Sequence, residues 1–271
     1  MLRRVTSVIV AVLVLLTISA TPAGADTEHA SSQYYLALGD SLAFGYQPNR
    51  DFTHGYVQQL YATLHAQQPR LLLQNLGCPG ETSTTLVTGG ICRYPGGASQ
   101  LDTAIAFLRA HPGKVRLITL DIGGNDVNPC VTPGGIDRAC FNQGLLHIAI
   151  NMSVAVARLR AAAPRAELVG MTYYDTVLAA WLTGPAGPAL AQQSLLFIHQ
   201  LNGLISVILR FARARVADVA KAFATDDMTL VNGVPLDVLR ICQWTWMCVQ
   251  RDIHANTIGY GVIAQTFAAV L

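Results

Sequence analysis

Short runs of apolar residues alternate along the chain with longer segments in which apolar side chains recur every three or four positions. The short runs are typical of strands buried in a sheet, and the longer segments are typical of amphipathic helices. The predicted strands are residues 34–38, 71–75, 115–120, 167–172 and 215–219. The predicted helices are residues 54–67, 99–111, 144–163, 189–214 and 257–270.

This alternation predicts an α/β domain with three layers (α/β/α), in which helices cover both faces of a central, mainly parallel five-stranded sheet. Neither an internal repeat nor a linker divides the sequence. Segments rich in glycine and proline, at residues 78–97, 128–135 and 184–188, are expected to form loops.

The first residues have the layout of a secretory signal peptide. Two arginines near the start precede an almost wholly apolar run, residues 5–20, and small residues follow up to Ala25. An uncleaved anchor is the alternative, but the run contains hydroxyl residues and falls short of the ~20 residues that span a bilayer. We expect a signal peptide at residues 1–25, a single α/β domain at residues 26–271, and a secreted protein, extracellular or in the cell envelope.

Charge and hydropathy narrow the possible partners. The formal net charge is +2, and loss of the two leader arginines brings it to about zero. The sequence has no basic run or arginine stripe, so we expect no nucleic acid partner. No second apolar segment looks long enough to cross a membrane, so we expect no stable membrane span after signal cleavage.

The six cysteines fall as three neighbouring pairs: Cys78 and Cys92, Cys130 and Cys140, and Cys242 and Cys248. Sequential pairing closes short loops and is the simplest connectivity. Disulfides are typical of exported proteins. Zinc is the alternative, but the sequence has neither a C-x-x-C motif nor a histidine pair at ligand spacing. We therefore expect disulfides and no metal.

Three distinctive segments directly follow predicted strands: residues 39–42 (GDSL), 75–78 (NLGC) and 123–126 (GGND). In a parallel sheet covered on both faces, ligands bind beyond the carboxyl ends of the strands. A serine at the start of a helical turn, as predicted for Ser41, exposes its hydroxyl at that edge. Its ordinary alternative role is to cap the helix.

Acyl transfer requires hydrogen-bond donors where the oxyanion of the tetrahedral intermediate forms. The backbone N–H groups of Ser41 and Gly77 and the side-chain amide of Asn125 are candidates for an oxyanion hole. Glycine suits position 77 because it lets the backbone approach a substrate closely. Asn125 has the alternative role of satisfying backbone groups of its loop.

Together with His254, these blocks resemble the SGNH (GDSL) hydrolase family, and the resemblance runs from the first strand to the last helix. It implies the flavodoxin-like SGNH hydrolase fold, with Ser41 as nucleophile, His254 as base, and an oxyanion hole formed by Ser41, Gly77 and Asn125. It implies no cofactor. The three sequential cysteine pairs also resemble those of secreted actinobacterial esterases and lipases with three disulfides.

One position departs from the family pattern. Many members have an aspartate three residues before the histidine, where this chain has Arg251, whereas Asp252 lies two residues before His254. Residues two apart do not face each other on a helix. Two alternatives for the group that orients His254 therefore stay open: Asp252, or a backbone carbonyl within residues 244–250, held by a Cys242–Cys248 bridge.

Other residues near these blocks receive supporting roles. We interpret Asp40 as a structural residue of the turn and Asp126 as a support for its loop. Phe44, Tyr46 and Tyr94 lie on loops close to the expected site and are candidates for the wall of an acyl pocket.

We expect a secreted serine hydrolase that cleaves carboxylic esters, of lipids or small acyl groups, through a Ser41 acyl-enzyme. The alternatives are an acyltransferase or carbohydrate esterase acting on cell-envelope or glycan acyl groups, and a catalytically inactive secreted binding protein. We expect a monomer that acts on a small-molecule or lipid ester. The fold does not select the substrate, and the apolar composition favours acyl-chain esters.

Overall fold

The computed structural model describes residues 32–132 and 134–271. The signal peptide that we expect at residues 1–25 lies outside the described residues.

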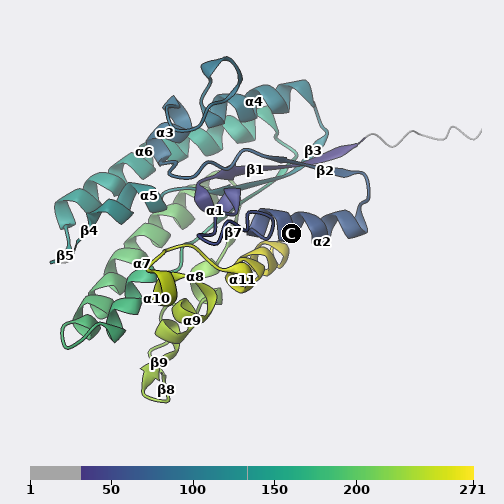
Figure 1. The fold of residues 1–271 in the computed structure, drawn as a ribbon. Coiled ribbons are helices and arrows are strands. Elements are labelled where there is room, and N and C mark those ends of the chain that lie inside the picture. The colour runs from purple at the N-terminus through teal and green to yellow at the C-terminus, as the bar shows by residue number, and fades with distance from the viewer. Residues whose placement is uncertain (1–31, 133) are drawn as a thin grey trace, which may run out of the picture. The chain divides into compact units, whose positions relative to one another are not determined.

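Five parallel strands form the central sheet (Figure 1). Their order across the sheet is β2 (Leu71–Asn75), β1 (Gln33–Gly39), β3 (Val115–Asp121), β6 (Glu167–Met171) and β7 (Arg215–Ala217). The central strand of the sheet, β3, is buried along most of its length. Its apolar run is nearly continuous because helices cover both faces of the sheet. The predicted five-stranded sheet is confirmed.

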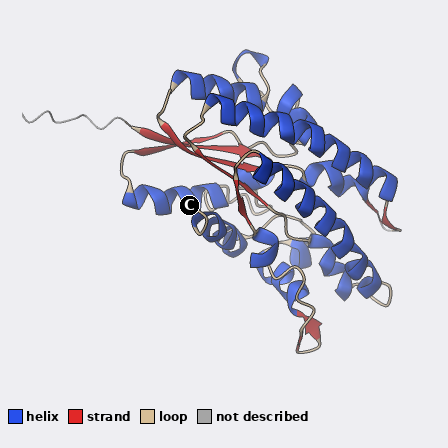
Figure 2. Cartoon of the chain, turned by 180° about the vertical axis from the view of Figure 1, so that it is seen from behind, coloured by secondary structure: helices blue, strands red, loops and turns tan. Residues whose placement is uncertain are grey.

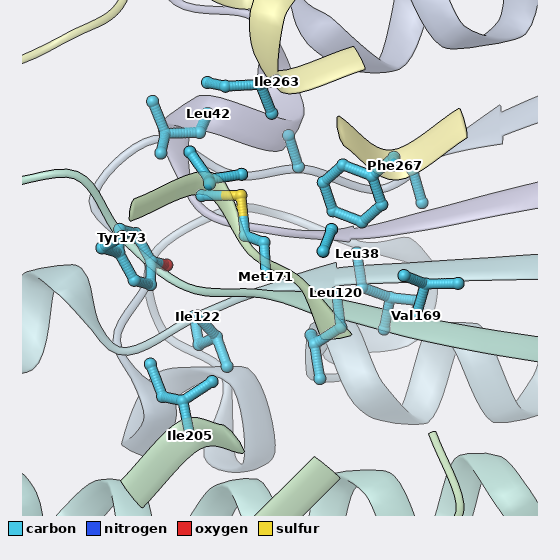
Figure 3. Packing of buried hydrophobic residues seen from close by; sticks show 14 of the residues in the cluster. Leu38, Leu42, Leu120, Ile122, Val169, Met171, Tyr173, Ile205, Ile263 and Phe267 are labelled. Atoms are coloured by element: carbon cyan, nitrogen blue, oxygen red, sulfur yellow. The ribbon is translucent and has the colours of Figure 1, made fainter. Parts of the chain in front are cut away.

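The long helices lie on both faces of this sheet, and Figure 2 shows the strands enclosed between them. Helices α4 (Gln100–Ala110), α6 (Arg138–Ala162) and α7 (Gly187–Phe211) pack side by side, and α2 (Tyr56–Gln67) packs against α11 (Thr257–Ala268). In Figure 3, Ile205 of α7 and Phe267 of α11 lie on opposite sides of the strands. The predicted three-layer α/β/α fold is therefore confirmed.

Shorter elements fill the connections. The helical turns are α1 (Ser41–Phe44), α3 (Ser83–Thr88), η1 (Pro95–Gly97), α5 (Gly124–Val127), η2 (Asn128–Cys130), η3 (Thr176–Leu182), α8 (Val219–Ala222), α9 (Leu236–Trp244) and α10 (Met247–Gln250). Two small hairpins pair β4 (Val131–Thr132) with β5 (Gly135–Ile136), and β8 (Leu230–Val231) with β9 (Val234–Pro235).

Two connections differ from the sequence prediction because side-chain caps start helices there. The predicted loop at residues 78–97 contains α3, whose N-cap Thr82 forms a reciprocal capping box with Thr85. Helix α6 begins six residues before the predicted start at 144, because the Asp137 carboxylate accepts the N–H groups of Ala139 and Cys140.

Helices α6 and α7 also correct the expectation about apolar segments. Each has 25 residues, with mean hydropathies of 1.3 and 1.4, which is long and apolar enough to span a bilayer. The prediction that no such segment follows the leader is therefore wrong as to length and composition. Both helices pack against each other and around the core of the domain, and core helices share these properties.

Three disulfides join Cys78 to Cys92, Cys130 to Cys140, and Cys242 to Cys248. This is the sequential pairing that we expected. The three loops that they close connect elements at the carboxyl edge of the sheet.

Candidate active site

The turn that carries Ser41 follows β1 at the carboxyl edge of the sheet. Gly39 ends the strand with φ of +146°, and a Cβ at this position would lie 2.4 Å from the backbone oxygen of Asp121. Only glycine permits this close approach. Asp40 then caps α1, because its Oδ1 accepts the N–H of Leu42 at 2.8 Å. Ser41 is consequently the first residue of the helical turn.

His254 contacts both Ser41 and Asp252. Its Nε2 lies 2.8 Å from Ser41 Oγ, and its Nδ1 lies 2.6 Å from Asp252 Oδ1. The three side chains therefore form a continuous hydrogen-bonded chain. This is the geometry in which a histidine removes a serine proton while a carboxylate fixes the imidazole tautomer.

The structure decides between the two alternatives for the group beside His254 Nδ1: it is the Asp252 carboxylate and not a backbone carbonyl. The spacing of two residues does not keep Asp252 and His254 apart, because both lie outside helices and regular strands. Arg251 adopts a left-handed conformation, with φ of +55°. Asp252 Oδ1 then accepts the backbone N–H of His254 at 2.9 Å, which folds the carboxylate back over the imidazole.

The backbone around His254 is held on both sides. The N–H of Trp246 donates to the carbonyl of His254 at 2.9 Å, and Thr245 forms a β-bridge with Ala255. The Cys242–Cys248 disulfide closes the segment that carries Trp246. The disulfide loop thus supports the histidine through backbone contacts, although it supplies no ligand for Nδ1.

None of the three aromatic residues proposed for the wall of an acyl pocket lines the cavity beside Ser41, so that prediction is wrong, although Tyr46 contacts His254. The ring of Tyr46 lies 4.5 Å from that of His254, centroid to centroid. Phe44 packs on Phe52. Tyr94 bonds the carbonyl of Leu76. Tyr46 therefore packs against the His254 ring.

Asn125 lies in α5, directly after β3. Its Nδ2 donates one hydrogen bond to the carbonyl of Glu81 at 2.9 Å, which leaves a second amide hydrogen. The next residue, Asp126, accepts both the backbone N–H and the hydroxyl of Ser83, at 2.8 and 2.6 Å. Asp126 therefore joins the loop of Asn125 to the segment after β2, in the supporting role expected from the sequence.

Gly77 is placed differently from the expectation. Its N–H donates to Asn75 Oδ1 at 2.9 Å, and a Cβ would lie 2.4 Å from the backbone nitrogen of Phe44. The glycine thus permits close packing of two loops, while its N–H is already engaged. Gly80, with φ of +85°, has no hydrogen-bond partner for its N–H among the described residues.

Behind the nucleophile turn lies a pair of buried carboxyl groups that the sequence analysis did not identify as a pair. Asp121, at the end of β3, accepts hydrogen bonds from the Tyr56 hydroxyl and from the N–H of Ala43. Burial first, and then the neighbouring Asp40 charge, raise the pKa of Asp121 well above its ordinary value. Burial also raises the pKa of Asp40. Two such carboxyl groups in contact favour sharing a proton.

A cavity of about 90 Å³ opens beside Ser41 and His254. Its far wall is almost wholly apolar and comes from the first hairpin and helices α5, α6 and α7, through Val127, Val131, Ile136, Phe141, Phe197, Ile198 and Leu201. Phe141 and Phe197 pack edge to face at 4.8 Å. Tyr173, Asp175 and Ser194 also line the cavity. The cavity therefore suits a substrate whose apolar group lies against this wall while its reacting carbon lies at Ser41.

No group of three or more histidine, cysteine, aspartate or glutamate side chains suited to a metal ion occurs in the part of the chain that the structure describes.

A serine, a histidine and an aspartate in hydrogen-bonded sequence at the carboxyl edge of an α/β sheet define the class of serine-dependent hydrolases. Residues 37–262 match the model of the GDSL-like Lipase/Acylhydrolase family, and the chain belongs to that family. No curated protein sequence matches the chain.

Several solved structures have a similar fold. The α/β hydrolase LAE5 from the metagenome of Lake Arreo is 21% identical, with a TM-score of 0.54 over 89% of this chain and 95% of that one. An extracellular lipase from Streptomyces rimosus is 16% identical, with a TM-score of 0.58 over 89% and 100% of the two chains. A phospholipase A1 from Streptomyces albidoflavus is 17% identical, with a TM-score of 0.54 and the same coverage.

Proposed function

We propose that this protein is a secreted carboxylic ester hydrolase in which Ser41 forms an acyl-enzyme, His254 acts as the base and Asp252 orients the histidine. The observation that carries the proposal is the contact of His254 with both partners, at 2.8 Å to Ser41 Oγ and 2.6 Å to Asp252 Oδ1. Both distances are within hydrogen-bond range.

The reaction proceeds in two steps. His254 Nε2 takes the hydroxyl proton of Ser41 as Oγ attacks the ester carbonyl carbon, and the C–O bond to the alcohol breaks as the histidine returns the proton to the leaving oxygen. A water molecule then repeats the sequence, giving its proton to His254 and its oxygen to the acyl carbon. The products are the free acid and restored Ser41.

The oxyanion of each tetrahedral intermediate requires donors that are not already engaged. The backbone N–H of Ser41 and the second amide hydrogen of Asn125 meet this requirement. We assign the third donor to the N–H of Gly80 in place of Gly77, because the Gly77 N–H is bonded to Asn75. The Asn125 amide lies against the carbonyl of Glu81, the residue next to Gly80, which supports this assignment.

The cavity supports an ester with an apolar acyl group of modest length. Its volume is about 90 Å³. A short acyl chain fits this space, and the Phe141–Phe197 pair closes the apolar wall. A long fatty acyl chain would have to leave the cavity or displace this wall.

Secretion is supported by three disulfides, which persist in oxidising compartments, and by the structural similarity to an extracellular Streptomyces lipase. The leader predicted from the sequence agrees with the same location.

The test is hydrolysis of a p-nitrophenyl ester series, from acetate to palmitate, by the wild type and by Ser41→Ala. We expect turnover of the shorter acyl chains by the wild type and a loss of at least ~10³-fold in kcat in the variant. Adding an alcohol acceptor and looking for a new ester product separates hydrolysis from acyl transfer. Failure of a fluorophosphonate to label Ser41 would overturn the proposal.

A further inference from the structure

Gln100, the first residue of α4, clamps the backbone just before the nucleophile turn. The side chain is fully buried, at 0% exposure. Its Oε1 accepts the N–H of Gly39 at 2.8 Å, and its Nε2 donates to the carbonyl of Gly39 at 2.9 Å. A single amide therefore satisfies both backbone groups of the residue that ends β1 and starts the turn to Ser41.

The same amide reaches the segment after β2. Gln100 Nε2 lies 3.2 Å from Glu81 Oε2 and 3.1 Å from the Tyr94 hydroxyl. Glu81 is 1% exposed, and its other oxygen, Oε1, has no partner among the described residues. A buried carboxyl group with an orphaned oxygen is costly, because its lost hydration is not replaced. The other carboxyl oxygen of Glu81, Oε2, accepts the hydrogen bond from the Gln100 amide.

The backbone of Glu81 supports the proposed oxyanion hole. Its carbonyl accepts the amide of Asn125 at 2.9 Å, and its N–H donates to the carbonyl of Cys78 at 3.1 Å. Gly80, the proposed backbone donor, precedes it in the chain. A continuous series of hydrogen bonds therefore runs from Gly39 through Gln100 and Glu81 to Asn125.

We propose that Gln100 and Glu81 are positioning residues that hold the oxyanion-hole donors at a fixed distance from the Ser41 nucleophile. They touch neither substrate nor reacting atoms. They act by joining the backbone two residues before Ser41 to the loop that carries the Gly80 N–H and orients Asn125. This inference rests on the proposed function, since it concerns the transition state of the same reaction.

The proposal predicts a specific kinetic signature. Oxyanion-hole donors stabilise the transition state more than the bound ester, so loosening them lowers kcat and leaves KM nearly unchanged. Removing one such donor in other enzymes costs ~10²–10³-fold in kcat. Because Gln100 acts on the donors through their support, we expect Gln100→Leu to lower kcat by ~10–100-fold with KM within ~3-fold.

Two substitutions at Glu81 separate positioning from bulk packing. In Glu81→Gln the amide oxygen still accepts the Gln100 N–H, so we expect kcat within ~3-fold of the wild type. Glu81→Leu removes the acceptor and is expected to lower kcat by ~10-fold or more. Val156→Ala, a nearly buried residue on α6 away from the site, is the control for lost stability and is expected to keep its kcat.

The deciding readout is inhibition by a trifluoromethyl ketone, whose adduct with serine carries an oxyanion. Its inhibition constant is expected to rise in Gln100→Leu and Glu81→Leu by the same factor as kcat falls, with no such rise in Glu81→Gln or Val156→Ala.

If the wild type hydrolyses esters but kcat falls equally in Glu81→Gln and Glu81→Leu, the inference is wrong and the proposed function stands. Unchanged ketone inhibition in both leucine variants would have the same meaning. If Gln100→Leu does not fold, the comparison of the two Glu81 variants decides alone. A wild type without activity and without fluorophosphonate labelling contradicts the proposed function instead.

Discussion

The hydroxyl of Tyr173 donates a 3.0 Å hydrogen bond to Oδ2 of Asp40, 133 residues away in the sequence. Tyr173 lines the cavity, and its backbone N–H and carbonyl are both held by the Asn202 amide, at 2.7 and 2.8 Å. Asp40 caps the turn that starts with Ser41. The pocket wall and the nucleophile are thus joined through one buried hydrogen bond.

Replacing Tyr173 by phenylalanine leaves the Asp40 carboxyl without this partner. Because the bond is buried and its acceptor is a carboxyl group, we expect the free energy of unfolding to fall by ~1–3 kcal/mol, measured in urea. We also expect kcat to fall, because the cap of the Ser41 turn loosens. Tyr35→Phe is the matched control, since the Tyr35 hydroxyl bonds Thr119 within the sheet. Full activity in Tyr173→Phe would show that the contact is structural alone.

Asp252→Asn tests the orienting role of the carboxylate. An asparagine can present its N–H to His254 Nδ1 and so stabilise the wrong tautomer, with Nε2 protonated and unable to accept the Ser41 proton. We expect kcat to fall by ~10²–10⁴-fold in ester hydrolysis.

The chain offers a matched control in a second aspartate–histidine pair, Asp226 with His199, whose side chains are 67% and 55% exposed. Asp226→Asn is expected to leave kcat unchanged. A wild-type rate in Asp252→Asn would remove Asp252 from the mechanism, despite its contact with the imidazole.

Phe197 is expected to limit the acyl chain that the cavity accepts. Phe197→Leu removes part of the edge-to-face pair with Phe141, and we expect the preferred acyl chain of the p-nitrophenyl series to lengthen. A methylene group in an apolar pocket is worth ~1–3 kcal/mol, so kcat/KM for the next longer ester should rise by ~10–200-fold. Phe211→Leu, on the same helix but 88% exposed, is the control. An unchanged preference would place the acyl group elsewhere.

Asp175 makes stability depend on pH. Burial raises the pKa of this carboxyl group to about 6, from the ordinary value of 3.8. Between these two values the folded protein keeps a proton that the unfolded chain has lost, so the free energy of unfolding falls as pH rises. Two pKa units correspond to at most ~3 kcal/mol for this group.

Asp175→Asn removes that proton, while its amide can still bond the Ser194 hydroxyl and the Val177 N–H, the two partners of the carboxylate. We therefore expect the variant to lose less stability than the wild type between pH 4.5 and pH 7, by urea unfolding. Identical slopes for the two proteins would contradict a raised pKa at Asp175.

The periodicity of apolar residues was sufficient for the sheet and the long helices, because these elements bury continuous or evenly spaced side chains. This periodicity did not predict the start of α6, because the start depends on the Asp137 cap. The pairing of Asp252 with His254 was also left open, because it depends on the left-handed conformation of Arg251. A helix cap and a positive φ angle each depend on single residues, so the spacing of hydrophobic residues does not predict them.

Ser41, His254 and Asn125 were identifiable from their blocks, whereas the glycine assigned to the oxyanion hole was not. Residues 77 and 80 are both glycines in one loop, and only the hydrogen bond between the Gly77 N–H and Asn75 distinguishes them. In the structure, Ser83 of the segment after Gly80 bonds Asp126 of the Asn125 block, a contact that the sequence does not show. The carboxyl pair of Asp40 and Asp121 depends on the alignment of β1 with β3, which one sequence does not give.

The three disulfides divide the molecule into parts that respond differently to a reducing environment. The sheet is held by its core and by none of these bonds, whereas each bond closes one loop of the site: beside Gly80, at the cavity hairpin, and before Asp252. The loops around the site are therefore cross-linked, whereas the sheet beneath them is held by non-covalent packing. A reduced chain that keeps cooperative unfolding but loses ester hydrolysis would show that the cross-links position these loops without holding the sheet.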